Sequence, residues 1–220
     1  MKSAGTLASL LLCGALLAGC SDDGGDPETP EPTDGASSSA SPAAQEPEQE
    51  GVPEGTELTP EGTDLVLGDE AVVSYEPRQE TVGVLEVSVT RIERTTFRAS
   101  FAGWQLGAST KRTTPYFVRA TLTNAGETDL GGRQVPLYGV DSKDMLVEAS
   151  TFKGRFKPCP SRPFPKAFAP GATHEACLVY LAPAGTTLAA VSFRPTQEYV
   201  PITWTGPVSK VRPVKRKPRP

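Results

Sequence analysis

Short stretches of alternating apolar and polar residues run through the middle of the chain, between residues 65 and 207. A period of two is typical of β-strands that bury one face and expose the other. Two stretches, 83–93 and 115–130, show this alternation most clearly. Their inward-facing residues are Leu85, Val87 and Val89 in the first stretch and Val118, Ala120 and Leu122 in the second. We therefore expect both stretches to contribute strands to one buried core.

Further strands are predicted at 71–75, 134–140, 145–149, 176–181, 188–193 and 200–204. Gly, Pro, Asn and Asp separate them, and no long helical periodicity interrupts the series. Residues 141–144 fit a hairpin loop, whereas 97–107 fits a strand, a loop or a short helix. Seven or eight short strands predict an all-β, antiparallel sandwich, with a closed barrel as the main alternative. Trp104 and Trp204 are expected to pack in its core or at its rim.

Residues 1–19 have the layout of a secretory signal peptide. Lys2 precedes an apolar run of about a dozen residues, which is too short to span a bilayer as a simple helix. The run ends in Leu17-Ala18-Gly19-Cys20, which resembles a bacterial lipobox. In proteins with that motif the signal is cut before the cysteine, and the thiol carries a diacylglycerol. We therefore predict a lipid on Cys20, with ordinary cleavage beside an incidental cysteine as the alternative.

Residues 20–64 are rich in Pro, Glu, Asp, Gly, Ser and Thr, with 13 acidic residues and no Lys or Arg. Such a composition buries too little apolar surface to offset the entropy of ordering, which predicts a disordered acidic linker. The folded domain is then expected at 65–207. Residues 208–220 form a proline-rich tail, also predicted to be disordered. Its cations are Lys210, Arg212, Lys215, Arg216, Lys217 and Arg219.

Besides Cys20, two cysteines remain after the predicted cleavage, Cys159 and Cys177. An exported chain with two such cysteines is expected to join them in a disulfide. The alternatives are a metal site and a redox pair. A metal site needs three or four ligands, but His174 is the only histidine, and the cysteine spacing is unlike Cys-x-x-Cys.

No catalytic constellation is present in the sequence. It contains no Gly-x-Ser-x-Gly, no phosphate-binding glycine loop and no His-Glu-x-x-His. We expect His174 to be a surface residue of a loop. The sequence thus predicts a non-catalytic protein without a cofactor or a metal, although calcium bound by scattered loop carboxylates is an alternative.

The segment 152–168 interleaves cations with phenylalanines. A basic, aromatic loop of this kind binds anionic polymers, including nucleic acid, in some proteins. We favour the alternative that the aromatic rings pin the loop to the sheet while its cations face water. The residues concerned are Lys153, Arg155, Lys157, Arg162 and Lys166, with Phe152, Phe156, Phe164 and Phe168.

The stretches PYFVRATLTNAGETDL, PGATHEACLVYLAP and LAAVSFRP resemble the immunoglobulin-like domain of secreted bacterial lipoproteins of actinobacterial type. Many of these carry an acidic, proline-rich spacer after the lipobox. The resemblance covers about 65–207 and implies an immunoglobulin-like β-sandwich. It implies no catalytic residue, because no activity is generally established for that group.

Together these observations predict a lipid-anchored protein on the extracytoplasmic face of the cell membrane, acting as a non-catalytic binding module. One alternative is a structural protein that organises the envelope through its acidic linker and basic tail. Another is an enzyme or a small-molecule carrier. The expected partners are the membrane, through the N-terminal lipid, and an anionic cell-wall polymer or an envelope protein, but not nucleic acid. The tail has three candidate partners: anionic lipid, wall polymer and the protein's own linker.

Overall fold

The computed structural model describes residues 51–79 and 81–211. The predicted signal peptide, Cys20 and most of the predicted linker lie outside these residues, as do residues 212–220 of the predicted tail. The description below concerns the described part alone.

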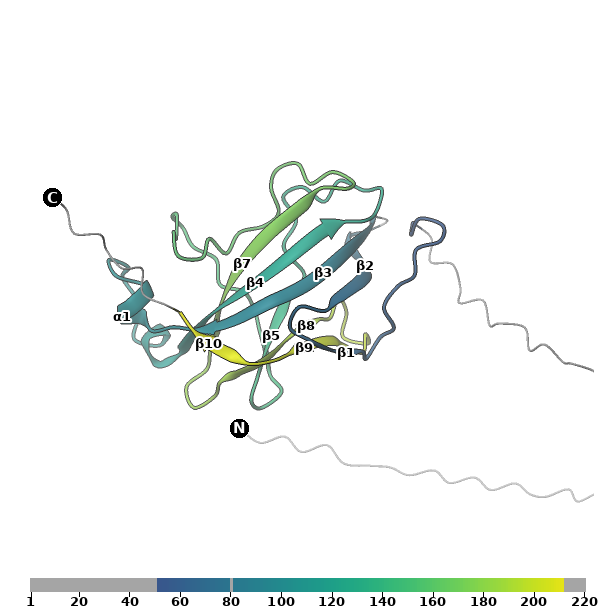
Figure 1. Cartoon of the computed structure of the whole chain (residues 1–220). Helices are drawn as coiled ribbons and strands as arrows, with labels where there is room; N and C mark the ends of the chain where they lie inside the picture. Colours follow the sequence, from purple (N-terminus) through teal and green to yellow (C-terminus); the bar gives the residue numbers. More distant parts are fainter. Residues whose placement is uncertain (1–50, 80, 212–220) are drawn as a thin grey trace, which may run out of the picture. The chain divides into compact units, whose positions relative to one another are not determined.

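The described residues form two five-stranded sheets that pack face to face (Figure 1). Sheet A has the order β1 (Asp64–Val66), β9 (Ile202–Thr205), β8 (Leu188–Phe193), β5 (Tyr138–Asp141) and β6 (Leu146–Val147). Sheet B contains β2 (Glu70–Arg78), β3 (Thr81–Arg94), β4 (Thr114–Asn124), β7 (Thr173–Ala182) and β10 (Val208–Lys210). β3, β4 and β7 are neighbours in that order and pair antiparallel. β2 and β10 share the other edge of β3, one after the other along its length.

The period-two alternation buries one face of each sheet in a shared hydrophobic cluster, which we call the main core. The six residues predicted to face inward from β3 and β4 are all buried. Trp204 of β9 is fully buried, and its indole N–H donates to the Asp69 carbonyl at 3.1 Å. Gly139 of β5 lies where a Cβ would come within 2.6 Å of Leu188, so the strand approaches its neighbours too closely for any side chain. The main core is therefore tightly packed around the predicted apolar positions.

The predicted all-β sandwich of mainly antiparallel strands is confirmed, with ten strands in the described residues instead of seven or eight. The sequence missed β1 and β10, which have three residues each. Both pair in parallel, β1 with β9 and β10 with β3. A three-residue strand is too short to show a period of two, and its partner is remote in sequence. The two predicted strands at 134–140 and 145–149 are shorter in the structure, where β5 and β6 take only part of them.

Both predicted boundaries of the folded domain are corrected by the structure. Residues 51–64, assigned to the linker, lie against the sandwich: the Gly62 N–H donates to the Val200 carbonyl (3.0 Å), and the Val200 N–H donates to Glu61 (2.9 Å). At the other end, residues 208–210 of the predicted tail form β10. Composition alone misplaced these limits because backbone hydrogen bonds hold polar segments whose side chains bury little apolar surface.

Two loops, 97–107 and 141–144, are compact; the sequence left the form of the first open and predicted a hairpin loop for the second. Segment 97–107 begins with a one-turn helix, α1 (Phe97–Ser100), whose N-cap Thr96 accepts a hydrogen bond from the Ala99 N–H. The 141–144 loop joins β5 to β6 as predicted. The Asp141 carboxylate accepts hydrogen bonds from the N–H groups of Lys143 and Met145, so it closes the hairpin.

Candidate functional site

The outer face of sheet B, which faces away from the main core, is apolar at one end. Tyr116 and Val118 of β4 point into the main core, whereas Phe117 between them points outward, as does Val179 of β7. On an open sheet these two side chains would face water, yet both are at most 1% exposed. Something must therefore cover this end of the sheet.

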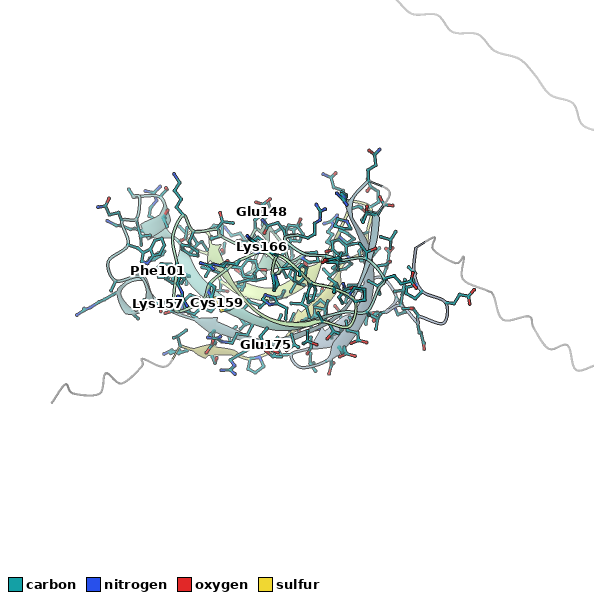
Figure 2. All side chains as sticks on the ribbon, turned by 90° about the horizontal axis from the view of Figure 1, so that it is seen from above. Phe101, Glu148, Lys157, Cys159, Lys166 and Glu175 are labelled. Atoms are coloured by element: carbon teal, nitrogen blue, oxygen red, sulfur yellow. A yellow bond between two sulfur atoms is a disulfide. The ribbon has the colours of Figure 1, made fainter. Side chains whose placement is uncertain are left out.

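Two loop segments provide the cover, and we call them together the lid: residues 97–112 and 150–160. They contribute most of a second hydrophobic cluster, separate from the main core. Its buried residues are Phe101, Phe117, Phe156, Cys159 and Val179, with Phe97, Trp104, Leu106, Phe152, Cys177, Leu181 and Val211 partly buried around them. Figure 2 shows Phe101, Lys157 and Cys159 of the lid together at one end of the molecule.

Aromatic rings join the two segments of the lid to each other. Phe156 stacks on Phe101 and on Phe152, with ring centroids 4.6 Å apart in each pair. Trp104 meets Phe152 edge-on at 5.1 Å. Aromatic pairs at these separations add about 0.5–1.5 kcal/mol each beyond the area that they bury. The lid is thus a packed structure, and the expected packing role of Trp104 is confirmed.

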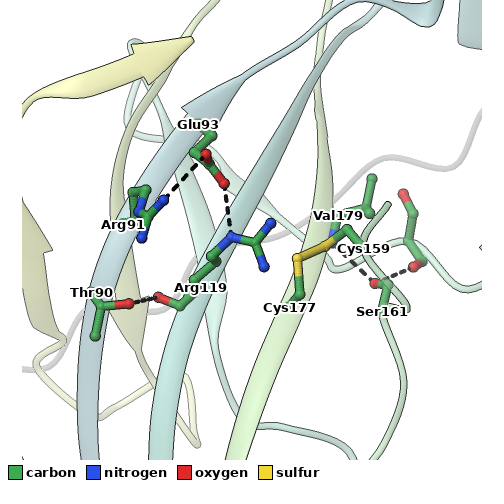
Figure 3. Close-up of a disulfide and its surroundings, with 9 residues drawn as sticks. Thr90, Arg91, Glu93, Arg119, Cys159, Ser161, Cys177 and Val179 are labelled. Atoms are coloured by element: carbon green, nitrogen blue, oxygen red, sulfur yellow. Dashed lines mark hydrogen bonds and ion pairs between the residues drawn. A yellow bond between two sulfur atoms is a disulfide. The ribbon is translucent and has the colours of Figure 1, made fainter. Parts of the chain in front are cut away.

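A disulfide between Cys159 and Cys177 fastens the lid to β7, as predicted (Figure 3). The Cα atoms of the two cysteines lie 5.2 Å apart, and the bridge closes a loop with a sequence separation of 18. In the chain-entropy model, a bridge over a loop of this size stabilises the folded state by about 3 kcal/mol. The predicted alternatives for these residues, a metal site and a redox pair, are not needed.

Ser161, two residues after Cys159, completes the attachment. Its N–H donates to the Cys177 carbonyl (2.8 Å), its hydroxyl donates to the Ser150 carbonyl (2.6 Å), and the hydroxyl oxygen accepts from the Val179 N–H (3.0 Å). The residue is buried and has a φ of 46°, a left-handed conformation that serine adopts only where its surroundings impose it. Hydrogen bonds to the backbone of β7 therefore fix the end of the lid.

The lid and the strand ends that border it expose a set of cations. Segments 94–126 and 149–174 contain no Asp or Glu. The set consists of eight exposed residues: Arg94, Arg98, Lys111, Arg112, Lys153, Arg155, Lys157 and Lys210. Within the described residues, none of the eight takes part in an ion pair of 4.0 Å or less. Their charge therefore faces solvent without a carboxylate partner.

Glu93 is the acidic residue nearest to the lid along β3, and its carboxylate is already engaged. It accepts a hydrogen bond from Arg119 Nε at 2.9 Å and lies 3.6 Å from Arg91 (Figure 3). The side chain of Glu93 is only 10% exposed. The single negative charge of Glu93 is thus shared by two guanidinium groups, and it is not available to the cations of the lid.

The second half of the long loop, residues 161–172, packs on the main core instead. Phe164 and Phe168 are buried and stacked at 4.4 Å. Asp129 accepts hydrogen bonds from the N–H groups of Phe168 (2.9 Å) and Gly131 (2.8 Å), which hold the pKa of its carboxyl below the ordinary value. The prediction that the aromatic rings pin this loop while its cations face water is thus confirmed.

His174 is not a loop residue, which corrects the prediction. It lies in β7, opposite Leu122, half-buried against the rings of Phe164 and Phe168. Burial lowers its pKa, and neighbouring Glu175 opposes this effect. A neutral imidazole between aromatic rings is a packing residue at neutral pH.

A shallow groove of about 380 Å³, which no sequence pattern predicted, lies elsewhere on the sandwich. It is lined by Tyr75 of β2, Tyr138 of β5 and residues 132–136 of the segment that connects β4 to β5, including Arg133. Burial raises the pKa of Tyr75 to about 12, and Arg133 opposes the shift. The phenol is therefore protonated at neutral pH, so it can donate a hydrogen bond but cannot serve as a base.

Two further findings concern residues 51–79 and 81–211. No cluster of three or more His, Cys, Asp or Glu side chains there is arranged to hold a metal ion. No helix in the same residues combines the length and the apolar character needed to cross a bilayer.

No protein-family profile matches this chain, and no curated protein is significantly similar to it. Among solved structures, the fold is similar to that of MPT63, described as a secreted protein from Mycobacterium tuberculosis. The TM-score is 0.45 and the sequence identity is 10%, over 65% of this chain and 96% of MPT63.

The predicted site residues are three cysteines. Cys159 and Cys177 form the predicted disulfide, and Cys20 lies outside the described residues. The sequence did not reveal that segments 97–112 and 150–160 meet. One available signal was Phe117, an apolar residue on the polar side of the alternation in β4.

Proposed function

We propose that this chain is a lipid-anchored, non-catalytic binding module on the extracytoplasmic face of the cell membrane, and that the lid is its contact surface. The observation that carries the proposal is the lid itself: a loop structure stapled by a disulfide, packed by aromatic rings and covered with unpaired cations. Disulfides persist in exported proteins, which agrees with the signal peptide expected at 1–19.

In this proposal Cys20 carries the lipid, and the acidic segment that follows separates the sandwich from the membrane. The Cys159–Cys177 bridge keeps the lid in place. The partner is an anionic wall polymer or an envelope protein, since unpaired Lys and Arg side chains attract negative charge. Because the lid is made of ordered loops on a rigid sheet, it resembles the arrangement in which sandwich loops serve as binding surfaces.

Lipid attachment is tested by comparing the wild-type chain with Cys20→Ser in a bacterial host. We expect radioactive palmitate to label the wild type, which should fractionate with membranes, and Cys20→Ser to carry no label and to appear in the soluble fraction. Cys13→Ser is the matched control and should behave as the wild type. Unlabelled wild-type protein, or labelling that survives Cys20→Ser, would contradict the lipid anchor.

A second candidate, an envelope-organising role through charge, is supported by residues 51–70. This segment exposes six carboxylates and contains no cation. They belong to Glu54, Glu57, Glu61, Asp64, Asp69 and Glu70. The negative charge of residues 51–70 and the positive charge of the basic tail, residues 208–220, would let copies of the chain associate. Sedimentation velocity at low and high salt tests this: association that salt abolishes supports it, and a monomer at low salt excludes it.

A further inference from the structure

We infer that the lid binds a phosphate-bearing polymer, a chain that repeats phosphate or phosphodiester groups. This inference rests on the binding role proposed for the lid, but not on the lipid at Cys20. The exposed cations of the lid and of the strand ends beside it come from segments that are far apart in the sequence. The second cluster brings these segments to one end of sheet B. The contacts that join these segments, and the chemistry of the cations, carry the argument.

Three contacts place the cationic segments side by side. The ring of Trp104 lies 3.8 Å from the position of a Cβ on Gly154, in the middle of the Lys153–Lys157 run. Phe101, three residues after Arg98, stacks on Phe156. The Val211 N–H donates to the Arg94 carbonyl at 3.0 Å, and the Val211 side chain packs against the second cluster. Lys210 therefore lies beside Arg94 at the end of β3.

The lid is ordered before any ligand arrives. The disulfide, the aromatic stack and the buried Ser161 hold its backbone, so binding does not require the loops to fold. Only the ends of exposed Lys and Arg side chains must be immobilised. Pre-ordering of this kind reduces the entropic cost of association.

The chemistry of the cations favours phosphate groups along an extended chain. Four of the eight are arginines, whose planar guanidinium matches the geometry of phosphate oxygens. The eight belong to four separate stretches of backbone, around residues 94–98, 111–112, 153–157 and 210. They do not converge from a single turn, as in a site for one small anion. A polymer can touch several of these stretches at once, and each contact releases condensed counterions.

A lipid surface fits this face less well. Proteins that settle into a membrane interface insert exposed Trp, Phe or Leu side chains beside their cations. In the described residues, the large apolar side chains that are most exposed lie outside both lid segments. They are Val66, Met145, Leu146, Val200 and Val208. The aromatic residues of the lid are packed against one another instead, so the lid offers charge without an inserting group.

The test measures binding of inorganic polyphosphate to the chain from residue 21 to 220, which contains both hydrophobic clusters. The decisive variant is Lys153→Gln/Arg155→Gln/Lys157→Gln. Its matched control, Arg78→Gln/Lys143→Gln/Lys166→Gln, removes three exposed cations outside the lid, so both variants have the same net charge. Lys153→Arg/Arg155→Lys/Lys157→Arg keeps the charge and checks the fold. A chain that ends at residue 211 removes the tail cations.

We expect the lid variant to bind polyphosphate at least about tenfold more weakly than the wild type, with a smaller dependence on salt. The control and the charge-conserving variant should each bind within about threefold of the wild type. The inference fails if the lid variant and its control lose equal affinity, or if removal of 212–220 alone abolishes binding. It also fails if polyglutamate binds as tightly, or if vesicles of phosphatidylglycerol bind and polyphosphate does not.

These outcomes can be separated from the test of the lipid anchor. Loss of palmitate labelling concerns residue 20 and leaves polyphosphate binding by the lid unchanged. Conversely, a chain that is labelled on Cys20 but binds no polyphosphate keeps its anchor and loses the ligand class inferred here.

Discussion

The two hydrophobic clusters of this protein are closed in different ways. The main core lies between two sheets, and strands supply most of its residues in regular alternation. The second cluster lies on the outside of sheet B, where loops cover Phe117 and Val179. Strands are held by their neighbours along their whole length, but loops need other fastenings, and here these are a disulfide, an aromatic stack and a buried serine. The same strand, β4, is therefore covered on one face by a sheet and on the other by loops.

The long loop between β6 and β7 passes from one cluster to the other at Ser161. Before this residue the loop is attached covalently, through Cys159; after it, Phe164 and Phe168 are held by hydrogen bonds from their backbone to Asp129 and to neighbouring segments. Gly131 belongs to this second attachment, because a Cβ there would overlap the Lys166 carbonyl. Each half of the loop can therefore be released separately.

The largest effect is expected from damage to the main core. Trp204→Ala removes a fully buried indole from β9, which should lower the free energy of unfolding by about 3–5 kcal/mol, because the cavity left behind cannot collapse between two sheets. Urea unfolding followed by far-UV circular dichroism measures the loss. We expect a single transition in which the lid and the sheets unfold together. Trp204→Phe is the control and should lose less. If Trp204→Ala lowered the free energy of unfolding less than removal of the disulfide does, the main core would not be the larger contributor to stability.

The next effect is expected from release of the lid. Cys159→Ala/Cys177→Ala should lower the free energy of unfolding by about 3 kcal/mol, since the unfolded chain regains the entropy of the closed loop. Limited trypsin digestion should then cut faster at Lys153 and Arg155, with the sandwich retained. Cleavage at Lys143, an exposed residue of the 141–144 loop outside the lid, is the internal control. Equal acceleration at Lys143, or no change in the lid, would show that the bridge does not hold the lid in particular.

The main core could be predicted from the sequence, and the second cluster could not. The spacing of Leu85, Val87 and Val89 alone predicts that they share one face of a strand, because a strand has a fixed period. The disulfide was predictable for a different reason: only two cysteines remained to pair. Loops have no period, so nothing in the sequence indicates that Trp104 and Phe152 touch. The groove at Tyr75 and Arg133 was equally hidden, because its walls come from segments that only the packed sheets bring together.

The two missed strands show another limit of sequence patterns. β1 and β10 are held by backbone hydrogen bonds to strands remote in the chain, and most of their side chains are exposed. An exposed polar strand and an exposed polar linker have the same composition. The boundaries at 64 and 208 were therefore misplaced, although the existence of the domain between them was predicted correctly.

The smallest effect is expected at the polar attachment of the loop, and it should depend on pH. Asp129 has a pKa below its ordinary value of about 3.8, because the N–H groups of Phe168 and Gly131 donate to the carboxylate. A carboxyl whose pKa is lowered on folding stabilises the protein above its unfolded pKa, and this stabilisation disappears as the pH falls through the folded value. Asp129→Asn keeps an acceptor oxygen but removes the charge. It should therefore be less stable than the wild type at pH 7, and the difference should shrink towards pH 3.

Urea unfolding of both proteins at pH 7 and pH 3 measures this difference. Glu127→Gln is the matched control, because Glu127 is exposed two residues away and its carboxylate accepts no hydrogen bond found in the described residues. The control should track the wild type at both values of pH. A difference between Asp129→Asn and the wild type that stays constant with pH would show that the carboxylate acts by its shape alone. The polar half of the loop would then owe its position to the packing of Phe164 and Phe168 in the main core.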